Sequence, residues 1–326
     1  MPIAWAPFVD LVRRHKKLLL TTHVRPDGDG LGSMRALTEV LEQQGKQVRM
    51  VVASALPPRY NFLNTDGRVE RFTPPGDAYR DVDLAVVMDT GTRNQLGDFA
   101  PFLDSLQVDK VVIDHHPTQD DLHALQLLDT KAEATGRLAF EAISALGGSL
   151  SASAASALFV AVAMDTGWFR HSNSTPATFT LAAELVKAGA KPDILYDLLF
   201  DQNTLPRMRL TGLVLERLRT ESNGRIAYSE IRKGDYALTG AVPQDTEDMV
   251  NYTRGIIGVE VGLFFMEQPR GGVKVSFRSR SVVDVGKVAE SFGGGGHRLA
   301  SGAIVEAPLE EVQQRVVAAV KAALPA

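Results

Sequence analysis

Four short apolar runs in the first 115 residues constrain the fold more than any other feature of the sequence. They read KLLL (17–20), QVRMVV (47–52), LAVVM (84–88) and KVVI (110–113). A nearly continuous apolar run is typical of a strand that is covered on both faces. Segments with helical periodicity lie between the runs, such as LGSMRALTEVLEQQG at 31–45. This alternation predicts an α/β fold with a doubly wound, mostly parallel sheet.

The pattern changes in the second half of the chain. Helical patterns dominate residues 175–220, and after Asn223-Gly224 the segments RIAYSEI, IGVEVGLFFME and GVKVSFRS favour strands, with helices between them. We therefore predict a first domain at residues 1–190, a helical linker at 191–222, and a smaller mixed α/β domain at 223–326.

The composition excludes several classes of protein. The chain of 326 residues has no cysteine, which rules out disulfides, thiolate metal sites and cysteine nucleophiles, and favours a reducing cytoplasm. Its net charge of −4 provides no overall basic field for gripping long nucleic acid such as duplex DNA. No apolar run reaches the length of a membrane span, and no signal peptide is recognisable. We expect a cytoplasmic protein without a membrane partner.

Acidic and histidine side chains follow three of the apolar runs, at the point where each run ends, and an Asp-Thr-Gly triplet closes the helical pattern of residues 151–167. These side chains are His23, Asp27 and Asp29 after the first run, Asp89 after the third, Asp114, His115 and His116 after the fourth, and Asp165 in the triplet. Because the carboxyl ends of parallel strands meet at one edge of a sheet, we expect these side chains to converge.

Carboxylates and imidazoles without thiolates suit a divalent ion such as Mn²⁺. These ligands are too many for one ion that keeps a water position open, so we predict two ions that share a bridging carboxylate. Such a pair can generate hydroxide near neutral pH and stabilise the attacking and leaving oxygens at phosphorus. Taken singly, each aspartate is more typical of a helix cap or a turn, and the joint placement favours the metal site.

The stretch THVRPDGDGLGS at 22–33 places two aspartates among three glycines. We expect the glycines to let the backbone turn sharply, so that Asp27 and Asp29 face different ions, and a helix beginning near Leu31 to offer its amides to a phosphate. A calcium loop would place Leu31 at position five, which needs an oxygen ligand, and Thr38 at position twelve, which needs a bidentate carboxylate. A G-x-G-x-x-G dinucleotide fingerprint does not occur.

HVRPDGDGLGS, VVMDTG, VVIDHHP and VAMDTGWF, in this order, resemble the four motifs of the DHH phosphoesterases, and SFGGGGHRLASGA resembles the glycine-rich histidine motif of the DHH-associated C-terminal domain. This family includes manganese-dependent exonucleases, family II inorganic pyrophosphatases and small-nucleotide phosphodiesterases. The compact length is similar to that of the stand-alone NrnA-type oligoribonucleases, which degrade very short RNAs and remove the 3′-phosphate of pAp.

The resemblance implies roles for single residues. It implies that one ion is held by His23, Asp27 and Asp89, and the other by Asp29, Asp89, His115 and Asp165. Mn²⁺ is the first expectation, with Mg²⁺ or Co²⁺ as alternatives. Asp114 would orient a histidine, and His116 would meet the scissile phosphate as a hydrogen-bond donor or general acid.

The resemblance also implies substrate contacts. In the second domain these would be Arg278, Ser279, Gly294, Gly295, Gly296 and His297, because bare amides and an arginine fork bind phosphate. After the fourth motif, His171 and Asn173 are further candidates, whereas Trp168 is expected to be buried. Relatives often carry an acid and an arginine where this chain has Thr92 and Gln95, so the role of nearby Arg93 stays open.

We expect a two-metal phosphodiesterase for short oligoribonucleotides and pAp, as a monomer or homodimer. Residues 223–326 contain 12 basic and 12 acidic residues, which suits a short substrate gripped by a few specific groups. A phosphodiesterase for cyclic di-AMP or pApA is the alternative that the sequence hardly separates. A pyrophosphatase and a non-catalytic nucleotide sensor are less favoured, since the glycine-rich motif suits nucleotides and no predicted ligand is missing.

Overall fold

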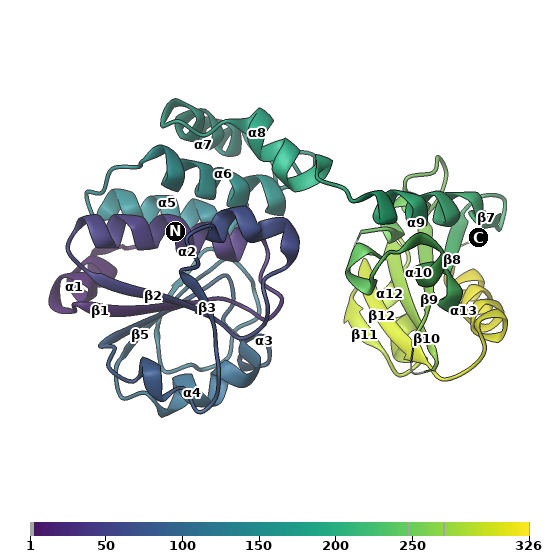
Figure 1. The fold of residues 1–326 in the computed structure, drawn as a ribbon, viewed down its shortest axis with the longest axis horizontal. Helices are drawn as coiled ribbons and strands as arrows, with labels where there is room; N and C mark the ends of the chain where they lie inside the picture. Colours follow the sequence, from purple (N-terminus) through teal and green to yellow (C-terminus); the bar gives the residue numbers. More distant parts are fainter. Residues whose placement is uncertain (1–2, 247, 270, 326) are drawn as a thin grey trace. The chain divides into compact units, whose positions relative to one another are not determined.

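The computed structural model of the protein describes residues 3–246, 248–269 and 271–325. The chain divides into two compact units, Met1–Gln202 and Asn203–Ala326 (Figure 1). The division lies within residues 191–222, where the sequence predicts a linker. On one side of it are α8 (Pro192–Tyr196) and a π-helical turn (Asp197–Asp201), and on the other is α9 (Leu205–Glu216).

The first unit contains a six-stranded sheet in the order β3-β2-β1-β4-β5-β6, and all of its strand pairs are parallel. The strands are β1 (Lys17–Thr21), β2 (Gln47–Val52), β3 (Val69–Arg71), β4 (Leu84–Met88), β5 (Asp109–Asp114) and β6 (Leu125–Leu128). The prediction of a doubly wound parallel sheet is confirmed. The strand order reverses between β1 and β4, and in such sheets ligands bind beyond the carboxyl ends of the strands at that point.

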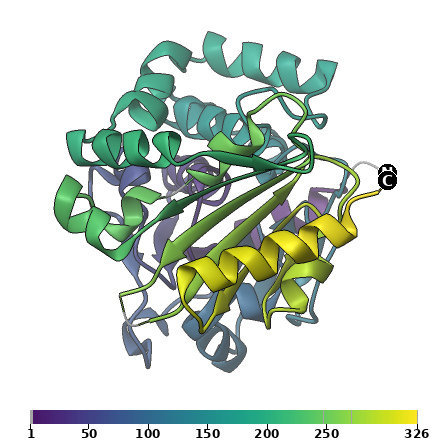
Figure 2. The same cartoon turned by 90° about the vertical axis from the view of Figure 1, so that its right-hand side faces the viewer.

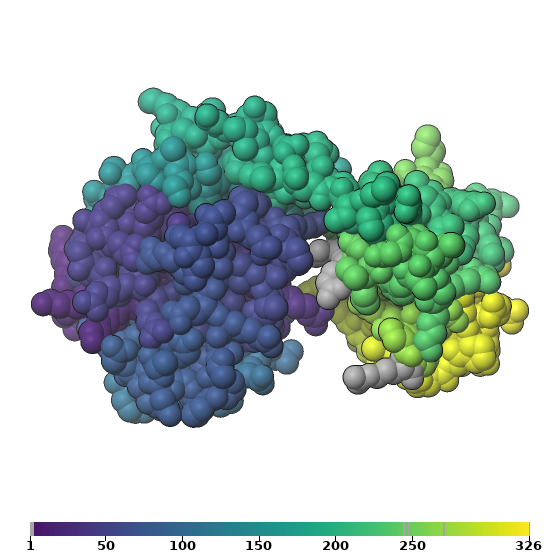
Figure 3. All heavy atoms as spheres, viewed as in Figure 1, coloured from purple at the N-terminus to yellow at the C-terminus, as the bar shows by residue number. Residues whose placement is uncertain are grey.

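Helices cover both faces of this sheet (Figure 1). Leu18 and Leu20 of β1 belong to the apolar core with helices α1 (Ala6–Arg14), α2 (Gly28–Gln43), α5 (Thr135–Ala145) and α6 (Ala152–Asp165). Leu19 faces the opposite core, formed with α3 (Arg93–Leu96) and α4 (Ala100–Ser105). All three leucines are fully buried, which is why the run carries no polar alternation. Helix α7 (Pro176–Lys187) lies at the surface, coloured teal in Figure 3.

Helix α2 begins earlier than expected. It starts at Gly28, not near Leu31, because the Asp27 carboxylate caps it by accepting the amides of Asp29 (3.0 Å) and Gly30 (3.1 Å). These amides are therefore already occupied, which corrects the expectation that they wait for a phosphate. Asp29 lies in the first helical turn.

The glycines of this stretch also differ from the expectation of a sharp turn. Gly28, Gly30 and Gly32 all lie in α2, and none has a positive φ. Each is needed for close packing, because a Cβ would lie 2.5 Å from Met164 Cγ, 2.2 Å from Thr22 Oγ1 and 2.2 Å from Ala157 O, respectively. The absent side chains let α2 approach both β1 and α6.

The second unit has a mixed six-stranded sheet in the order β11-β12-β10-β9-β8-β7, in which only the β8–β9 pair is parallel. The strands are β7 (Arg219–Glu221), β8 (Ile226–Ile231), β9 (Val261–Glu267), β10 (Val273–Ser279), β11 (Gly295–His297) and β12 (Ala300–Val305). Helices α12 (Val285–Glu290) and α13 (Leu309–Ala323) pack on one face (Figure 2). Helices α9, α10 (Lys233–Thr239) and α11 (Val250–Arg254) pack on the other. The prediction of a mixed α/β second domain is confirmed.

Within the part of the chain that the structure describes, no helix is both long and apolar enough to cross a bilayer.

Gly32→Ala is expected to destabilise the protein by about 1–3 kcal/mol, because the new methyl group meets the backbone carbonyl of Ala157, which cannot rotate away. Gly212→Ala is the matched control, since this exposed glycine in α9 has open space around it and alanine favours a helix. Thermal unfolding followed by circular dichroism should show a lower midpoint for Gly32→Ala alone. Equal midpoints for both variants and the wild type would contradict the close packing of α2 on α6.

Candidate metal centre

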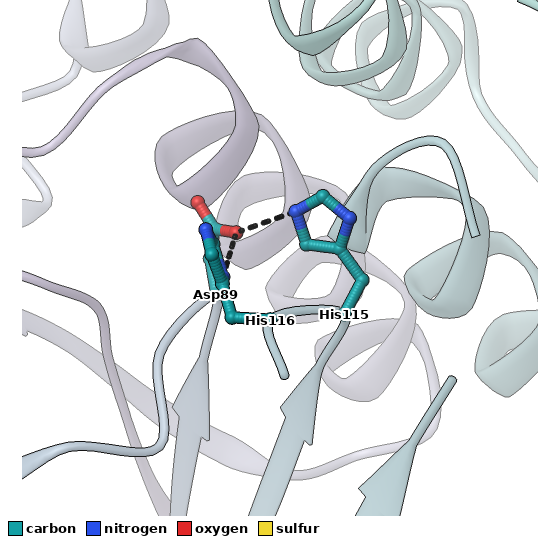
Figure 4. Close-up of side chains that lie close together, drawn as sticks. All are labelled: Asp89, His115 and His116. Atoms are coloured by element: carbon teal, nitrogen blue, oxygen red, sulfur yellow. Dashed lines mark ion pairs between the residues drawn. The ribbon is translucent and has the colours of Figure 1, made fainter. Parts of the chain in front are cut away.

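Asp89 lies at the centre of the converging side chains, directly after β4. It is 3% exposed, and its φ of +64° is uncommon for a residue other than glycine. Its Oδ2 lies 3.4 Å from His23 Nε2, and its Oδ1 lies 3.7 Å from His115 Nε2 and 3.8 Å from His116 Nδ1. Figure 4 shows the last two ion pairs as dashed lines. One carboxylate therefore faces three histidines.

His23 follows β1 and faces two carboxylates with one ring nitrogen. Its Nδ1 lies 3.0 Å from the carbonyl oxygen of Val24, so Nδ1 carries the proton in this hydrogen bond and Nε2 is directed to the acids. His23 Nε2 lies 3.6 Å from Asp27 Oδ1 in addition to its contact with Asp89. This is the orientation that a metal-binding imidazole requires.

His115 is also oriented by a backbone carbonyl, and its other ring nitrogen is buried among carboxylates. Its Nδ1 lies 3.1 Å from Ala132 O, while Nε2 is buried and has no hydrogen-bond partner among the described residues. That nitrogen points at Asp29 Oδ2 (3.9 Å) and Asp165 Oδ2 (3.6 Å), as well as at Asp89. A buried lone pair facing several carboxylates is unfavourable unless a cation lies between them. The residues present therefore fit a metal ion.

Among the described residues, three groups have ligand atoms within 4.8 Å of one another. They are His23, Asp27 and Asp89; Asp29, His115 and Asp165; and Asp89, His115 and His116. The structure thus brings together all six side chains that the sequence suggests as metal ligands. The grouping of Asp89 with both adjacent histidines was not expected.

Asp29 is 1% exposed and is held by the start of α5. Its Oδ2 accepts the amide of Thr135 (2.7 Å), and its Oδ1 accepts the amide of Gly136 (2.8 Å) and the hydroxyl of Ser33 (3.3 Å). The Thr135 hydroxyl also donates to Asp89 Oδ1 (3.0 Å). Sequence reasoning missed Thr135 and Gly136, because they lie inside an ordinary helical pattern without a charged residue to mark them.

Asp114 is fully buried at the end of β5 and orients His116. Its Oδ1 accepts the amides of His115 (2.8 Å) and His116 (3.1 Å) and lies 2.8 Å from His116 Nδ1. Its Oδ2 accepts the Gln119 side-chain amide at 2.6 Å. The His116 side chain is 51% exposed, so its Nε2 edge is free to meet a ligand. Gln119 is a further residue that sequence reasoning missed.

Burial and mutual repulsion shift the pKa values of the cluster. Burial raises the pKa of Asp29 well above its usual range, and the charge of Asp89 adds to this effect. Burial also raises the pKa of Asp165 to about 6. Burial acts to lower the pKa of His23, but the carboxylates of Asp27 and Asp89 outweigh it and raise that pKa to about 11. Without a metal, protons therefore supply the positive charge that the acids require.

Within the Asp114–His116 pair, the pKa of the acid is lowered and that of the histidine is raised. The hydrogen bond to Asp114 raises the pKa of His116 to about 8. Burial acts to raise the pKa of Asp114, but the hydrogen bonds from His116 and Gln119 keep it below its usual value. The imidazolium form of His116 is therefore favoured near neutral pH, and it can donate from Nε2.

The loop after α6 packs against the site and the neighbouring helices. The Asn173 side-chain amide donates to Glu133 O (3.1 Å) and Asp165 O (3.3 Å), which ties the loop to the cluster. His171 is exposed, with its ring against Gly167. Trp168 is half-buried and packs against four aromatic rings, those of Phe159, Phe169, Tyr196 and Phe200. Arg93 pairs with Asp104 through Nε at 3.1 Å.

In the second unit, Arg278 and Ser279 lie at the end of β10. The half-buried Arg278 donates from Nη1 to Phe277 O (3.0 Å), and burial lowers its pKa from the usual value. Ser279 is fully buried, and its hydroxyl donates to Glu260 Oε1 (3.0 Å). Within this unit Arg278 has a partly accessible charge, whereas Ser279 holds the strand end to its neighbour.

The glycine-rich segment forms an edge strand. Gly295, Gly296 and His297 make up β11 and pair with β12, and the side chain of His297 is exposed. Gly294 precedes them so close to β12 that a Cβ would lie 2.2 Å from Gly302 O. A hollow of about 330 Å³ lies beside this turn, lined by Lys274, Gly293, Gly294, Gly302, Ala303 and Ile304. The segment therefore offers bare backbone next to a lysine.

Comparisons with known proteins agree with this geometry. The family model described as the DHH family N-terminal domain matches residues 17–164, and that of the DHHA1 domain matches residues 223–325. The chain is 31% identical to the bifunctional oligoribonuclease and PAP phosphatase NrnA of Thermus thermophilus, over 93% of this chain and 89% of that protein. It is 28% identical to the protein of the same name from Bacillus subtilis, over 88% and 89%.

Among solved structures, an exopolyphosphatase-related protein from Bacteroides fragilis superposes with a TM-score of 0.93 at 24% identity. The match covers 98% of this chain and 97% of that one. At this identity the likeness establishes the shared fold.

Divalent-ion binding is expected to release protons at about pH 7, because His23 and the buried Asp29 carry protons that a metal must displace. Raising the pH removes the competing protons, so the apparent metal affinity should increase with pH. Calorimetric titrations with Mn²⁺ in two buffers of different ionisation enthalpy measure the number released. His23→Gln should release fewer protons than the wild type, whereas His123→Gln, an exposed site, should not. A binding heat independent of buffer would contradict the prediction.

Proposed function

This chain belongs to the DHH phosphoesterase family, and from that premise we propose that it hydrolyses short oligoribonucleotides to mononucleotides and removes the 3′-phosphate of pAp. The observation that carries the proposal is the position of Asp89, which belongs to two of the three ligand groups and can bridge two ions. The names of the relatives from Thermus thermophilus and Bacillus subtilis support the substrate class.

In this proposal, two ions are held by the side chains that converge at the sheet edge. His23, Asp27 and Asp89 would hold one, and Asp29, Asp89, His115 and Asp165 the other. Mn²⁺ fits this mixture of carboxylates and imidazoles, with Mg²⁺ and Co²⁺ as alternatives. A bound pair would lower the pKa of water and stabilise negative charge on phosphoryl oxygens.

The chain's own residues supply orientation and a proton. His116 would donate from Nε2 to a phosphoryl oxygen or to the leaving 3′-oxygen, while Asp114 and Gln119 fix its ring. Both oxygens of the buried Asp114 carboxylate are bonded to His115, His116 and Gln119. Asp114 therefore acts through His116 and does not contact the substrate. Asn173 fixes the end of α6 from which Asp165 projects.

The second unit would select substrates by specific groups. Residues 223–326, which make up most of this unit, carry 12 basic and 12 acidic residues and thus no excess of positive charge for a long strand. The Gly294 amide already donates to Ala289 O (2.9 Å), which corrects the expectation that it binds phosphate. Arg278 and the backbone of Gly295 and Gly296 are the groups we propose to bind a phosphate end, with His297 as an added donor. Such a set of contacts favours a substrate of a few nucleotides. His171 is proposed to contact the substrate from the first unit.

We expect pAp, pApA and a five-nucleotide RNA to be hydrolysed with Mn²⁺ at a kcat/KM at least about tenfold above that of a twenty-nucleotide RNA, a difference of about 1.4 kcal/mol. Product analysis by chromatography measures this, with cyclic di-AMP and pyrophosphate in the same panel. Equal cleavage of the long and short RNAs would contradict the proposal. Fastest cleavage of cyclic di-AMP would assign the same site to nucleotide signalling instead.

Asp89→Asn is expected to lower kcat by about a hundredfold or more, because it removes the bridging charge. Asparagine tolerates a positive φ, so the backbone at this position is retained. Asp98→Asn, at an exposed acid outside the cluster, is the matched control and should keep wild-type activity. Residual activity of Asp89→Asn equal to that of the control would show that the measured hydrolysis does not arise at this centre.

A further inference from the structure

We propose that residues 132–136 form an orienting segment that holds the predicted metal ligands in place, with Thr135 as its positioning residue. The proposal rests on the proposed function, because it takes these side chains to be metal ligands. The segment, Ala-Glu-Ala-Thr-Gly, carries no ligand of its own. It contacts Asp29, Asp89 and His115, which come from three separate parts of the chain.

The first contact fixes a histidine. Ala132 O lies 3.1 Å from His115 Nδ1, which sets the ring so that Nε2 points at the acids. A carbonyl behind a metal-binding imidazole selects the tautomer and raises the basicity of the other nitrogen. This contact comes from backbone alone, so no side chain in the sequence signals it.

The next contacts fix a carboxylate. Both oxygens of Asp29 accept amides from the first two residues of α5, Thr135 and Gly136. These amides have no partner inside their helix, and the positive end of the helix dipole favours a negative charge there. Asp29 is thereby held as a fixed carboxylate at the buried edge of the cluster.

Thr135 joins this carboxylate to the shared one. Its amide bonds Asp29 and its hydroxyl bonds Asp89 Oδ1, while the residue itself is fully buried. One residue therefore contacts a ligand of each proposed ion, and the hydroxyl sets the rotation of the bridging carboxylate.

The segment is itself anchored. The buried Glu133 carboxylate pairs with Arg137 at 2.7 Å, and Glu133 O accepts the Asn173 amide that also bonds Asp165 O. A Cβ on Gly136 would lie 2.6 Å from Ala161 Cβ, so the start of α5 is seated directly on α6. The orienting segment is thus connected to the residue that ends α6 and cannot shift independently of it.

The test compares Thr135→Val, which keeps the shape and amide but loses the hydroxyl, with Thr135→Ser, which keeps the hydroxyl. Thr38→Val is the matched control, because Thr38 is equally buried in the same unit and its hydroxyl has no partner among the described residues. Calorimetry measures the affinity and stoichiometry of Mn²⁺ binding. Electron paramagnetic resonance detects the magnetic coupling of a carboxylate-bridged Mn²⁺ pair.

We expect Thr135→Val to bind the weaker of the two ions about 10–100-fold less tightly and to lose the coupled-pair signal. Thr135→Ser and Thr38→Val should keep both. Two ions bound by Thr135→Val with wild-type affinity and an unchanged spectrum would overturn the inference. A wild type that binds fewer than two ions would instead refute the proposed two-metal centre. If circular dichroism shows Thr135→Val to be unfolded, Thr135→Ala is held to the same criteria.

Discussion

Repulsion among carboxylates that have lost their water is the constraint on which the first unit depends. Asp27, Asp29, Asp89 and Asp165 converge at one edge of the sheet, where burial makes the negative charges of Asp29 and Asp165 costly. The chain offsets part of this cost with histidines and with the amides at the starts of α2 and α5. In the proposed function, two divalent ions supply the remaining positive charge.

The topology of the sheet brings these carboxylates together. Reversal of the strand order between β1 and β4 opens an edge at which the loops of neighbouring strands can meet. Close packing of α2 against β1 and α6, at the three glycines, then brings Asp29 to the start of α5. Packing and chemistry are therefore linked through α2, whose core face is glycine-rich and whose first turn carries a carboxylate.

The sequence predicts the sheet, the mixed second domain and the convergence of six candidate ligands, because apolar runs and charged residues can be recognised from residue type alone. It does not predict the role of Thr135, whose importance comes from an amide and a hydroxyl facing two acids from distant segments. It also misjudges Gly28 and its neighbours, since a glycine needed for helix packing and one needed for a turn read alike. Burial of Ser279 against Glu260 is equally invisible, because both residues are polar and look exposed.

The left-handed backbone of Asp89 has an evolutionary consequence. Asparagine and glycine accept this conformation readily, and the codons of both differ from those of aspartate by one base. A single mutation can therefore remove the shared carboxylate and leave the chain folded, with the nucleotide contacts of the proposed function in place. In the proposed function, one base change in the Asp89 codon could therefore turn the enzyme into a protein that binds nucleotides without cleaving them. Most other replacements at this position would also strain the backbone.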